Sequence, residues 1–242
     1  MKLKDKTNLE YLKKYYKGNI NDAIKLLEEG KPAQYIVGNV DFYGYVLDVN
    51  ENVLIPRRET EELVEEVIKR SKSFTNPVMI DVGTGSGAIA IALSKELDCH
   101  VYASDISHKA LEVAKKNSIS NKASVTFLEG DMLKPYINQK VKADIIVSNP
   151  PYIMEDEEIE DVVKNNEPHI ALYAKNKGLE FYDSILKDAK YVLNDKFLIA
   201  FEIGVTQAEA IKELALKYLG DVTVEVKKDL SDKSRFIFVY NY

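Results

Sequence analysis

The feature that most constrains the fold is an alternation of short apolar segments with amphipathic ones, which runs from residue 78 onward. We expect strands in the apolar segments, at residues 78–81, 100–104, 125–128, 143–148 and 197–203. We expect helices in the amphipathic segments, at residues 88–97, 108–118, 179–193 and 206–219. Nearly continuous apolar strands separated by helices are typical of a parallel sheet covered on both faces. The last two apolar segments, residues 222–226 and 236–240, are joined without room for a helix, which predicts an antiparallel pair. The sequence therefore predicts an α/β fold with a doubly wound, mostly parallel sheet.

A polar break at residues 75–77 separates this alternation from a differently patterned N-terminal part. There we expect a helix at residues 20–29, stopped by Gly30, a hairpin at 42–49 and a helix at 59–70. We therefore divide the chain into a short N-terminal helix, hairpin and helix segment, residues 1–75, and one α/β domain, residues 76–242.

The composition narrows the classes of function. The net charge is −6, which argues against the clustered basic surface that grips nucleic acid. The single cysteine, Cys99, excludes an internal disulfide, and the isolated His100, His108 and His169 give no reason to expect a metal site. The charged first residues lack the apolar run of a signal peptide, and no apolar stretch approaches a membrane span. We therefore expect a cytoplasmic protein that has no membrane partner.

A glycine-rich loop, Asp81-Val-Gly83-Thr84-Gly85-Ser86-Gly87, follows the first strand of the alternation. Glycines permit positive φ angles and close approach of a ligand, although a tight strand-to-helix turn would also need them. The loop lacks the Gly-Lys-Ser/Thr ending of a P-loop, so it does not predict a triphosphate site. Asp105 ends the next strand, 20 positions beyond Gly85. A carboxylate there can accept both ribose hydroxyls of an adenosine, or it can cap the helix that follows.

The third strand of the alternation ends in Gly130-Asp131-Met132. Asp131 could accept from an adenine amino group, and Met132 could pack on the ring. Because the carboxyl ends of parallel strands meet at one edge of the sheet, we expect these segments to converge there. They predict a ligand that contains an adenosine and give no indication of a pyrophosphate.

The most informative stretch is Asn149-Pro150-Pro151-Tyr152, directly after the fourth apolar strand. Two prolines forbid continuation of the strand, because they lack N–H donors and have a fixed φ. The Asn149 side-chain oxygen and the Pro150 carbonyl can then accept both hydrogens of one planar –NH₂ group, with Tyr152 as a flat surface against it. The alternative interpretation is a strand terminator with a core tyrosine.

This arrangement suits methylation of a planar amine or amide. The nitrogen of such a group is a poor nucleophile because its lone pair is delocalised, and two acceptors would turn and polarise it. Positioning of this kind supplies roughly 7–11 kcal/mol in well-aligned systems. The sulfonium methyl of S-adenosylmethionine is a fitting electrophile, and no Ser/His/Asp or Cys/His nucleophile set is visible or needed.

Several separated motifs together resemble the peptide chain release factor glutamine methyltransferases, within the class I S-adenosylmethionine methyltransferases. The Asn-Pro-Pro-Tyr turn is also found in amino-methyltransferases that act on DNA, so the other motifs matter more. Residues 52–61, Asn-Val-Leu-Ile-Pro-Arg-Arg-Glu-Thr-Glu, closely resemble the family's Leu-Ile-Pro-Arg segment, whose Thr-Glu ending separates release-factor enzymes from ribosomal-protein relatives. Further matches are Gly38, Phe42, Glu167-Pro168, Ala171-Leu172, Gly178-Leu179, Phe181-Tyr182 and Phe201 to Gly204.

The resemblance implies a seven-stranded, mostly parallel sheet with the last strand reversed. It implies that Gly83 to Gly87 hold the methionine part of S-adenosylmethionine, that Asp105 binds the ribose and that Met132 lies by the adenine. Asn149 would lie beside the cofactor, and Asn149 to Tyr152 would hold the acceptor, a glutamine in the Gly-Gly-Gln loop of class 1 release factors. We accordingly expect a monomer that binds this protein substrate through residues 1–75, without a direct nucleic-acid partner.

Three departures from the family pattern accompany these matches. Fewer residues precede Gly38 than in the family's helical docking domain, Arg58 stands where a second proline is common, and residues 174–177 replace a Gly-rich stretch. The rival functions are an adenine or cytosine amino-methyltransferase, a glutamine methyltransferase for a ribosomal protein, and a non-catalytic cofactor-binding module. The sequence also leaves two roles open: that of Glu202, and that of the acidic run at residues 155–161, which is either a solvated face or a rim for a basic partner.

Overall fold

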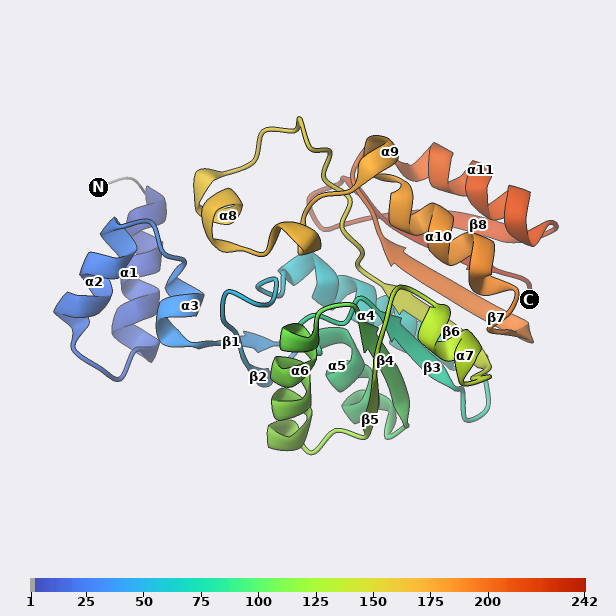
Figure 1. Cartoon of the computed structure of the whole chain (residues 1–242), viewed down its shortest axis with the longest axis horizontal. Helices are drawn as coiled ribbons and strands as arrows, with labels where there is room; N and C mark the ends of the chain where they lie inside the picture. Colours follow the sequence, from blue (N-terminus) through green and yellow to red (C-terminus); the bar gives the residue numbers. More distant parts are fainter. Residues whose placement is uncertain (1–2) are drawn as a thin grey trace.

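A seven-stranded sheet with helices on both faces forms the centre of the computed structural model, which describes residues 3–242 (Figure 1). The strand order is β5-β4-β3-β6-β7-β9-β8. Only β9 runs against its neighbours in this sheet, since it pairs antiparallel with both β7 and β8. The predicted fold class, including the reversed last strand, is therefore confirmed. The strands are β3 (Met79–Val82), β4 (Val101–Asp105), β5 (Val125–Glu129), β6 (Ala143–Ser148), β7 (Leu193–Glu202), β8 (Thr223–Lys228) and β9 (Ser234–Tyr240).

The central strands are apolar on both sides because each face of the sheet packs against helices. One face carries α7 (Lys134–Asn138), α10 (Glu180–Ala189) and α11 (Ala208–Leu219), which bury residues such as Tyr182 and Ile211 against it. The other face carries α4 (Arg58–Ser71), α5 (Ala88–Leu97) and α6 (His108–Asn121). The first seven residues of α5 are all buried, which explains why this helix is apolar on every side.

Two element boundaries differ from the prediction for one reason. The helix expected at residues 179–193 ends at Ala189, and β7 begins at Leu193, well before the expected start at residue 197. Val192 and Leu193 are buried, as a helix would require, but they pack at the base of β7, where Leu193 pairs with Ala143. A short apolar run does not distinguish a helix end from a strand start. The periodicity of the sequence also did not predict four short elements: α3 (Ala33–Val37), α8 (Asp161–Asn166), η1 (His169–Ala171) and α9 (Lys175–Gly178).

The N-terminal helices form an apolar cluster of their own, beside the sheet and not over it (Figure 1). They are α1 (Leu3–Tyr15), which was not predicted, α2 (Ile20–Glu28) and α3. Leu12 is the largest fully buried side chain of this cluster, and Ala23, Ala33 and Ile36 surround it. Their side of the molecule also meets α8, where the Asn166 amide donates to the Gly30 carbonyl over 3.0 Å.

The hairpin and α4 belong instead to the core of the sheet. The strands β1 (Asn39–Phe42) and β2 (Tyr45–Asp48) are joined through Tyr43 and Gly44, which both have positive φ as a two-residue hairpin turn requires. Phe42 and Leu47 from the hairpin and Leu63 from α4 are buried in the same cluster as α5. Among residues 3–242, none of the helices combines the length and the apolar character that crossing a bilayer requires.

The separate N-terminal cluster predicts separate stabilities. Leu12→Ala should destabilise α1 to α3 by about 2–5 kcal/mol, because it leaves a cavity in a small core, and should leave the sheet unaffected. Leu63→Ala should lower the stability of the whole sheet domain by a similar amount. Amide hydrogen exchange resolves the two effects, with Ile119→Ala, at a position that is 79% exposed, as the control without effect. A loss of protection throughout the sheet in Leu12→Ala would show that the two cores unfold together.

Candidate functional site

A cavity of about 340 Å³ lies at the carboxyl ends of β3, β4, β5 and β6. Parallel pairing in register brings these ends to one edge, since Val82 lies opposite both Ser104 and Ser148. Predicted site residues from four separate segments line the cavity: Gly83, Gly85, Asp105, Asp131, Met132, Asn149 and Pro151. Its size falls within the usual range of small-molecule sites.

The glycine loop presents two of its five predicted residues to the cavity. Gly83 and Gly85 have φ of 72° and 54°, and a Cβ added to either would meet no atom within 4 Å, so the backbone is open to a ligand there. Thr84 and Ser86 are buried, and Thr84 Oγ1 donates to Asp81 Oδ2 over 2.6 Å. Gly87 serves packing, because a Cβ there would lie 3.1 Å from Ile91 and 3.3 Å from Ala114 Cβ.

Asp105 is fixed by backbone donors on both sides. Its Oδ2 accepts from Gly85 N over 2.9 Å and its Oδ1 from Ser107 N over 2.8 Å. The cap of α6 is Ser107, whose side chain accepts from Ala110 N, so capping does not account for Asp105. Burial raises the pKa of Asp105, while the N–H groups of Ser107, Gly85 and Ile106 act in the opposite direction. The carboxyl group thus couples the glycine loop to β4 and keeps further lone pairs for a ligand.

The two residues after β5 differ in their surroundings. Met132 is buried in a left-handed conformation with φ of 47°, which is uncommon for a side chain of this kind. Asp131 lines the cavity but is part-exposed, and one of its oxygens forms an ion pair with Lys134 over 2.5 Å. Met132 therefore offers a fixed apolar surface, and Asp131 offers a carboxylate that is already shared with a cation.

A second, smaller pocket of about 80 Å³ adjoins the first one at the Asn-Pro-Pro-Tyr turn. It is lined by all four residues of the turn together with Leu54, Arg57, Ile153, Val163, Ala171, Leu172 and Glu202. The two pockets share Leu54, Asn149, Pro151 and Ala171 as lining residues. The turn is therefore the wall between a large cavity and a space of side-chain size.

The outer side of the small pocket is held by an ion pair. Arg57 Nη2 donates to Glu167 Oε1 over 2.6 Å, and Ile55 N donates to Glu167 Oε2 over 3.1 Å. Glu167 is buried, so this carboxylate connects the segment before α4 to the end of α8. The acidic residues 155–158 of the loop that precedes α8 are exposed.

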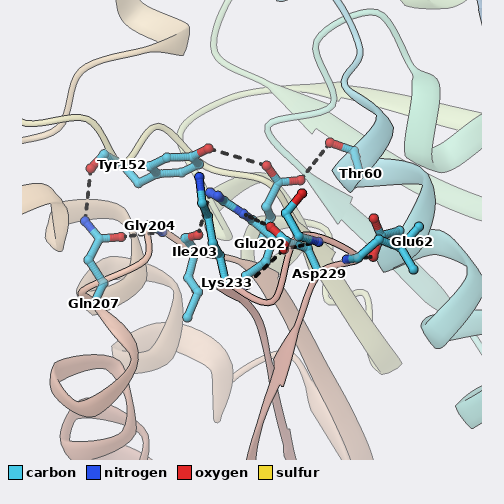
Figure 2. A network of polar contacts seen from close by, with 12 residues as sticks. Thr60, Glu62, Tyr152, Glu202, Ile203, Gly204, Gln207, Asp229 and Lys233 are labelled. Carbon is cyan, nitrogen blue, oxygen red and sulfur yellow. Dashed lines mark hydrogen bonds and ion pairs between the residues drawn. The ribbon is translucent and has the colours of Figure 1, made fainter. Parts of the chain in front are cut away.

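Beneath the turn, a network of polar contacts joins elements far apart in sequence (Figure 2). Asn149 Nδ2 donates to Thr60 Oγ1 over 3.1 Å, and Thr60 Oγ1 donates to Glu202 Oε2 over 2.7 Å. Tyr152 Oη donates to the other Glu202 oxygen over 3.5 Å, and Gln207 Nε2 donates to the Tyr152 carbonyl over 3.0 Å. Burial raises the pKa of Glu202 to about 7, although the Thr60 hydroxyl and Arg235 favour its charged form.

Sequence reasoning left Glu202 undecided and did not identify Thr60 or Gln207 as part of the site. Thr60 does lie in the segment at residues 52–61 that was singled out as a motif, so a signal existed for it. Gln207 follows the strand β7 by five residues and carries no pattern that would mark it. Among residues 3–242, no group of three or more His, Cys, Asp or Glu side chains is placed to hold a metal ion.

Comparison with known proteins gives consistent matches. Residues 59–167 match the family described as "Methyltransferase small domain". The release factor glutamine methyltransferase of Bacillus subtilis (strain 168) is 44% identical over 221 residues, which cover 88% of this chain and 77% of that protein. The protein of the same name from Staphylococcus aureus is 39% identical over 218 residues, covering 89% of this chain and 78% of that one.

A solved structure supports the same assignment. The release factor-specific protein-(glutamine-N5) methyltransferase of Alicyclobacillus acidocaldarius superposes with a TM-score of 0.51 and 29% identity, covering 80% of this chain and 98% of that one. Identity of about 40% over most of both chains, together with the shared fold, is sufficient to assign the family. The chain belongs to the release factor glutamine methyltransferases.

Proposed function

We propose that this protein transfers a methyl group from S-adenosylmethionine to the side-chain amide nitrogen of the glutamine in the Gly-Gly-Gln motif of class 1 peptide chain release factors. The observation that carries the proposal is the position of the Asn149 to Tyr152 turn, between a cavity of about 340 Å³ and a pocket of about 80 Å³. A cofactor and a side chain that approach from opposite sides would meet at this wall. The names of the relatives supply the identity of the acceptor.

The residues of the larger cavity fit the cofactor. S-adenosylmethionine supplies an electrophilic methyl group when it is bound. Gly83 and Gly85 leave the backbone accessible, Asp105 would accept the ribose hydroxyls, and Met132 would pack against the adenine. Thr84, Ser86 and Gly87 keep the loop in shape from behind, and Asp131 would reach the adenine amino group only with the oxygen that Lys134 leaves free.

The turn would orient the acceptor amide. Asn149 Oδ1 and the Pro150 carbonyl would each accept one hydrogen of the glutamine –NH₂, Pro151 would keep the bend rigid, and Tyr152 would lie against the plane of the amide. Two acceptors fix the rotation of the amide and increase electron density on its nitrogen. The nitrogen becomes acidic once it is alkylated, so its proton can leave afterwards, and the turn needs no strong base.

The remaining roles follow from the arrangement of the chain. We propose that the enzyme acts as a monomer. We assign release factor docking to residues 1–75, whose helices α1, α2 and α3 form a cluster beside the sheet, and catalysis to residues 76–242 with Thr60 of α4 in support. Because the acceptor would act in translation termination, we propose that the enzyme works in the cytoplasm. We also propose that it has no direct nucleic-acid partner and no membrane partner.

Incubation with radiolabelled cofactor tests the proposal. Release factor, a ribosomal protein fraction, DNA and RNA are supplied separately, and labelled release factor is digested for mass spectrometry. We expect label on release factor alone and a mass increase of one methylene on the glutamine of the Gly-Gly-Gln peptide. Label on nucleic acid or on a ribosomal protein, or no label at all, would reject the proposed acceptor.

Asn149→Ala should keep the cofactor and lose turnover. The variant removes one of the two acceptors that orient the amide, so we expect kcat to fall at least about 100-fold, by analogy with the loss of one oriented polar group in other active sites. The dissociation constant of the cofactor, measured by calorimetry, should change little. Asn138→Ala, at an exposed position at the end of α7, is the control with unchanged rates. A turnover close to that of the wild type in Asn149→Ala would reject the assigned role.

Asp105→Ala should instead weaken cofactor binding. The change removes two hydrogen bonds to ribose and also frees the Gly85 and Ser107 N–H groups, so we expect a loss of affinity of about 10- to 100-fold. Calorimetric titration with S-adenosylhomocysteine measures it without turnover. Glu129→Ala, which alters an exposed carboxylate at the end of β5, serves as the control. Equal affinities for all three proteins would exclude Asp105 from the cofactor site.

A further inference from the structure

Three buried or half-buried polar side chains, one in the turn and two beneath it, form one continuous chain of hydrogen bonds. Asn149 is the first residue of the turn and directly follows β6, Thr60 lies in the first turn of α4, and Glu202 is the last residue of β7. The contacts run from Asn149 Nδ2 to Thr60 Oγ1 and from Thr60 Oγ1 to Glu202 Oε2. Thr60 is only 4% exposed and Glu202 only 2% exposed. Solvent therefore has little access to replace either contact.

The proposed function requires the Asn149 side-chain oxygen, and not its –NH₂ group, to face the acceptor, and the turn alone does not ensure this. A side-chain amide has an oxygen and an –NH₂ group of nearly equal size, and a half rotation exchanges them. With the oxygen toward the acceptor, Asn149 receives a hydrogen bond from the glutamine –NH₂. With its own –NH₂ in that place, two donors would face each other. Neither proline constrains this rotation, so another group must select the orientation.

The polarity of the hydrogen-bond chain makes that selection. An ionised carboxylate only accepts, so Thr60 must use its single hydroxyl hydrogen on Glu202. The Thr60 oxygen is left with lone pairs alone, and it can satisfy Asn149 only by accepting from its –NH₂ group. The Asn149 oxygen then has to point the other way. One negative charge thus fixes the direction of both hydrogen bonds.

We propose that Glu202, acting through Thr60, is the positioning residue that holds the Asn149 amide with its oxygen toward the acceptor. The inference rests on the proposed function and adds a residue pair to it. The same carboxylate also accepts from Tyr152 Oη through its second oxygen, while Gln207 holds the Tyr152 carbonyl (Figure 2). Glu202 therefore orients both of the turn's side chains that would contact the acceptor. It also lines the small pocket, but the role proposed for it is exerted through Thr60 and Tyr152.

Protonation of Glu202 would allow the Asn149 amide to adopt either orientation. A neutral carboxyl can donate its proton to Thr60, the Thr60 hydroxyl can then donate to Asn149 Oδ1, and the rotated amide is satisfied equally well. Burial raises the pKa of Glu202 to about 7. Glu59 of α4 acts in the same direction, whereas Thr60, Arg235 of β9 and Tyr152 favour the charged form.

The other groups around this carboxyl act less directly. Tyr182 of α10 donates to the Glu202 backbone carbonyl, and Asp229 shares the Arg235 guanidinium. Arg57 opposes the rise in the pKa of Tyr152 that burial causes. Since the pKa of Glu202 is raised and the charged form is the competent one, turnover should fall as the pH decreases through about 7.

Three variants test the inference on the full-length protein with release factor as substrate. Thr60→Val keeps the shape of the side chain and removes the hydroxyl, and Thr60→Ser keeps the hydroxyl. We expect kcat to fall about 10- to 100-fold in Thr60→Val, with cofactor affinity within about threefold, and most of the rate to return in Thr60→Ser. Glu202→Gln should lower kcat and should also lose the decline of kcat between pH 8 and pH 6. Wild-type kcat in Thr60→Val, or an unchanged pH profile in Glu202→Gln, would overturn the proposal.

A spectroscopic measurement separates this inference from the proposed function. The side-chain amide protons of Asn149, assigned by their absence in Asn149→Ala, are followed by ¹⁵N–¹H NMR in the protein without substrate. They should move with a single titration near pH 7 in the wild type and should not move in Glu202→Gln. If the chemical shifts of these amide protons do not change with pH in the wild type, the positioning role of Glu202 is rejected, whichever acceptor the protein methylates. A protein that shows the titration but does not label release factor would support the positioning role of Glu202 and would reject the proposed acceptor.

Discussion

In-register parallel pairing of β3, β4, β5 and β6 is the constraint on which the rest of the site depends. It places the glycine loop, Asp105, Met132 and the Asn-Pro-Pro-Tyr turn at one edge of the sheet, although they span more than sixty residues of sequence. Their backbones are fixed there by ladder contacts that continue into the loops. Gly83 N and Thr84 N both donate to the Ser104 carbonyl, and Ser148 Oγ donates to the Val82 carbonyl. The sheet thus positions the loops that form one part of the cavity, and residues 52–54, 168, 170–171 and 180–181 contribute further parts of its lining.

The helix α4 contributes the Thr60 hydroxyl to this edge of the sheet. It comes from before β3 in sequence, packs on the sheet through Leu63, Val64 and Val67, and places Thr60 between Asn149 and Glu202. The same helix is fastened at a second point, where Glu62 accepts from Leu230 N in the loop between β8 and β9 (Figure 2). A helix held by its apolar face and by both of these polar contacts has little freedom to slide. The hydroxyl that directs Asn149 is therefore fixed by the packing of a whole element.

The sequence was sufficient to predict the sheet, because strands buried on both faces leave an apolar signal that residue-by-residue reading detects. It was also sufficient to place the glycine loop, Asp105 and the proline turn, because each follows a strand directly. It did not reveal that Thr60 and Glu202 are hydrogen-bonded, since they are separated by 142 positions and their contact depends on how α4 packs. The helix α1 was not predicted for a different reason. Its residues are mostly charged or polar, and Leu12, which is fully buried, packs against two other short helices.

Two buried carboxyl groups, those of Asp81 and Glu202, link the protonation state of the site to the stability of the fold. Burial raises the pKa of both Asp81 and Glu202 to about 7, and Asp81 Oδ1 has no hydrogen-bond partner among the described residues. A carboxyl whose pKa is raised by folding stabilises the native state most when it is neutral, and this contribution is lost as the pH rises through the folded value. The fold by itself therefore favours a protonated Glu202, whereas the orientation of Asn149 requires the charged form. Thr60, Arg235 and Tyr152 offset that preference by favouring the carboxylate, and they come from α4, from β9 and from the turn after β6. The turn can select one amide orientation only because these partners keep a charge where burial alone would remove it.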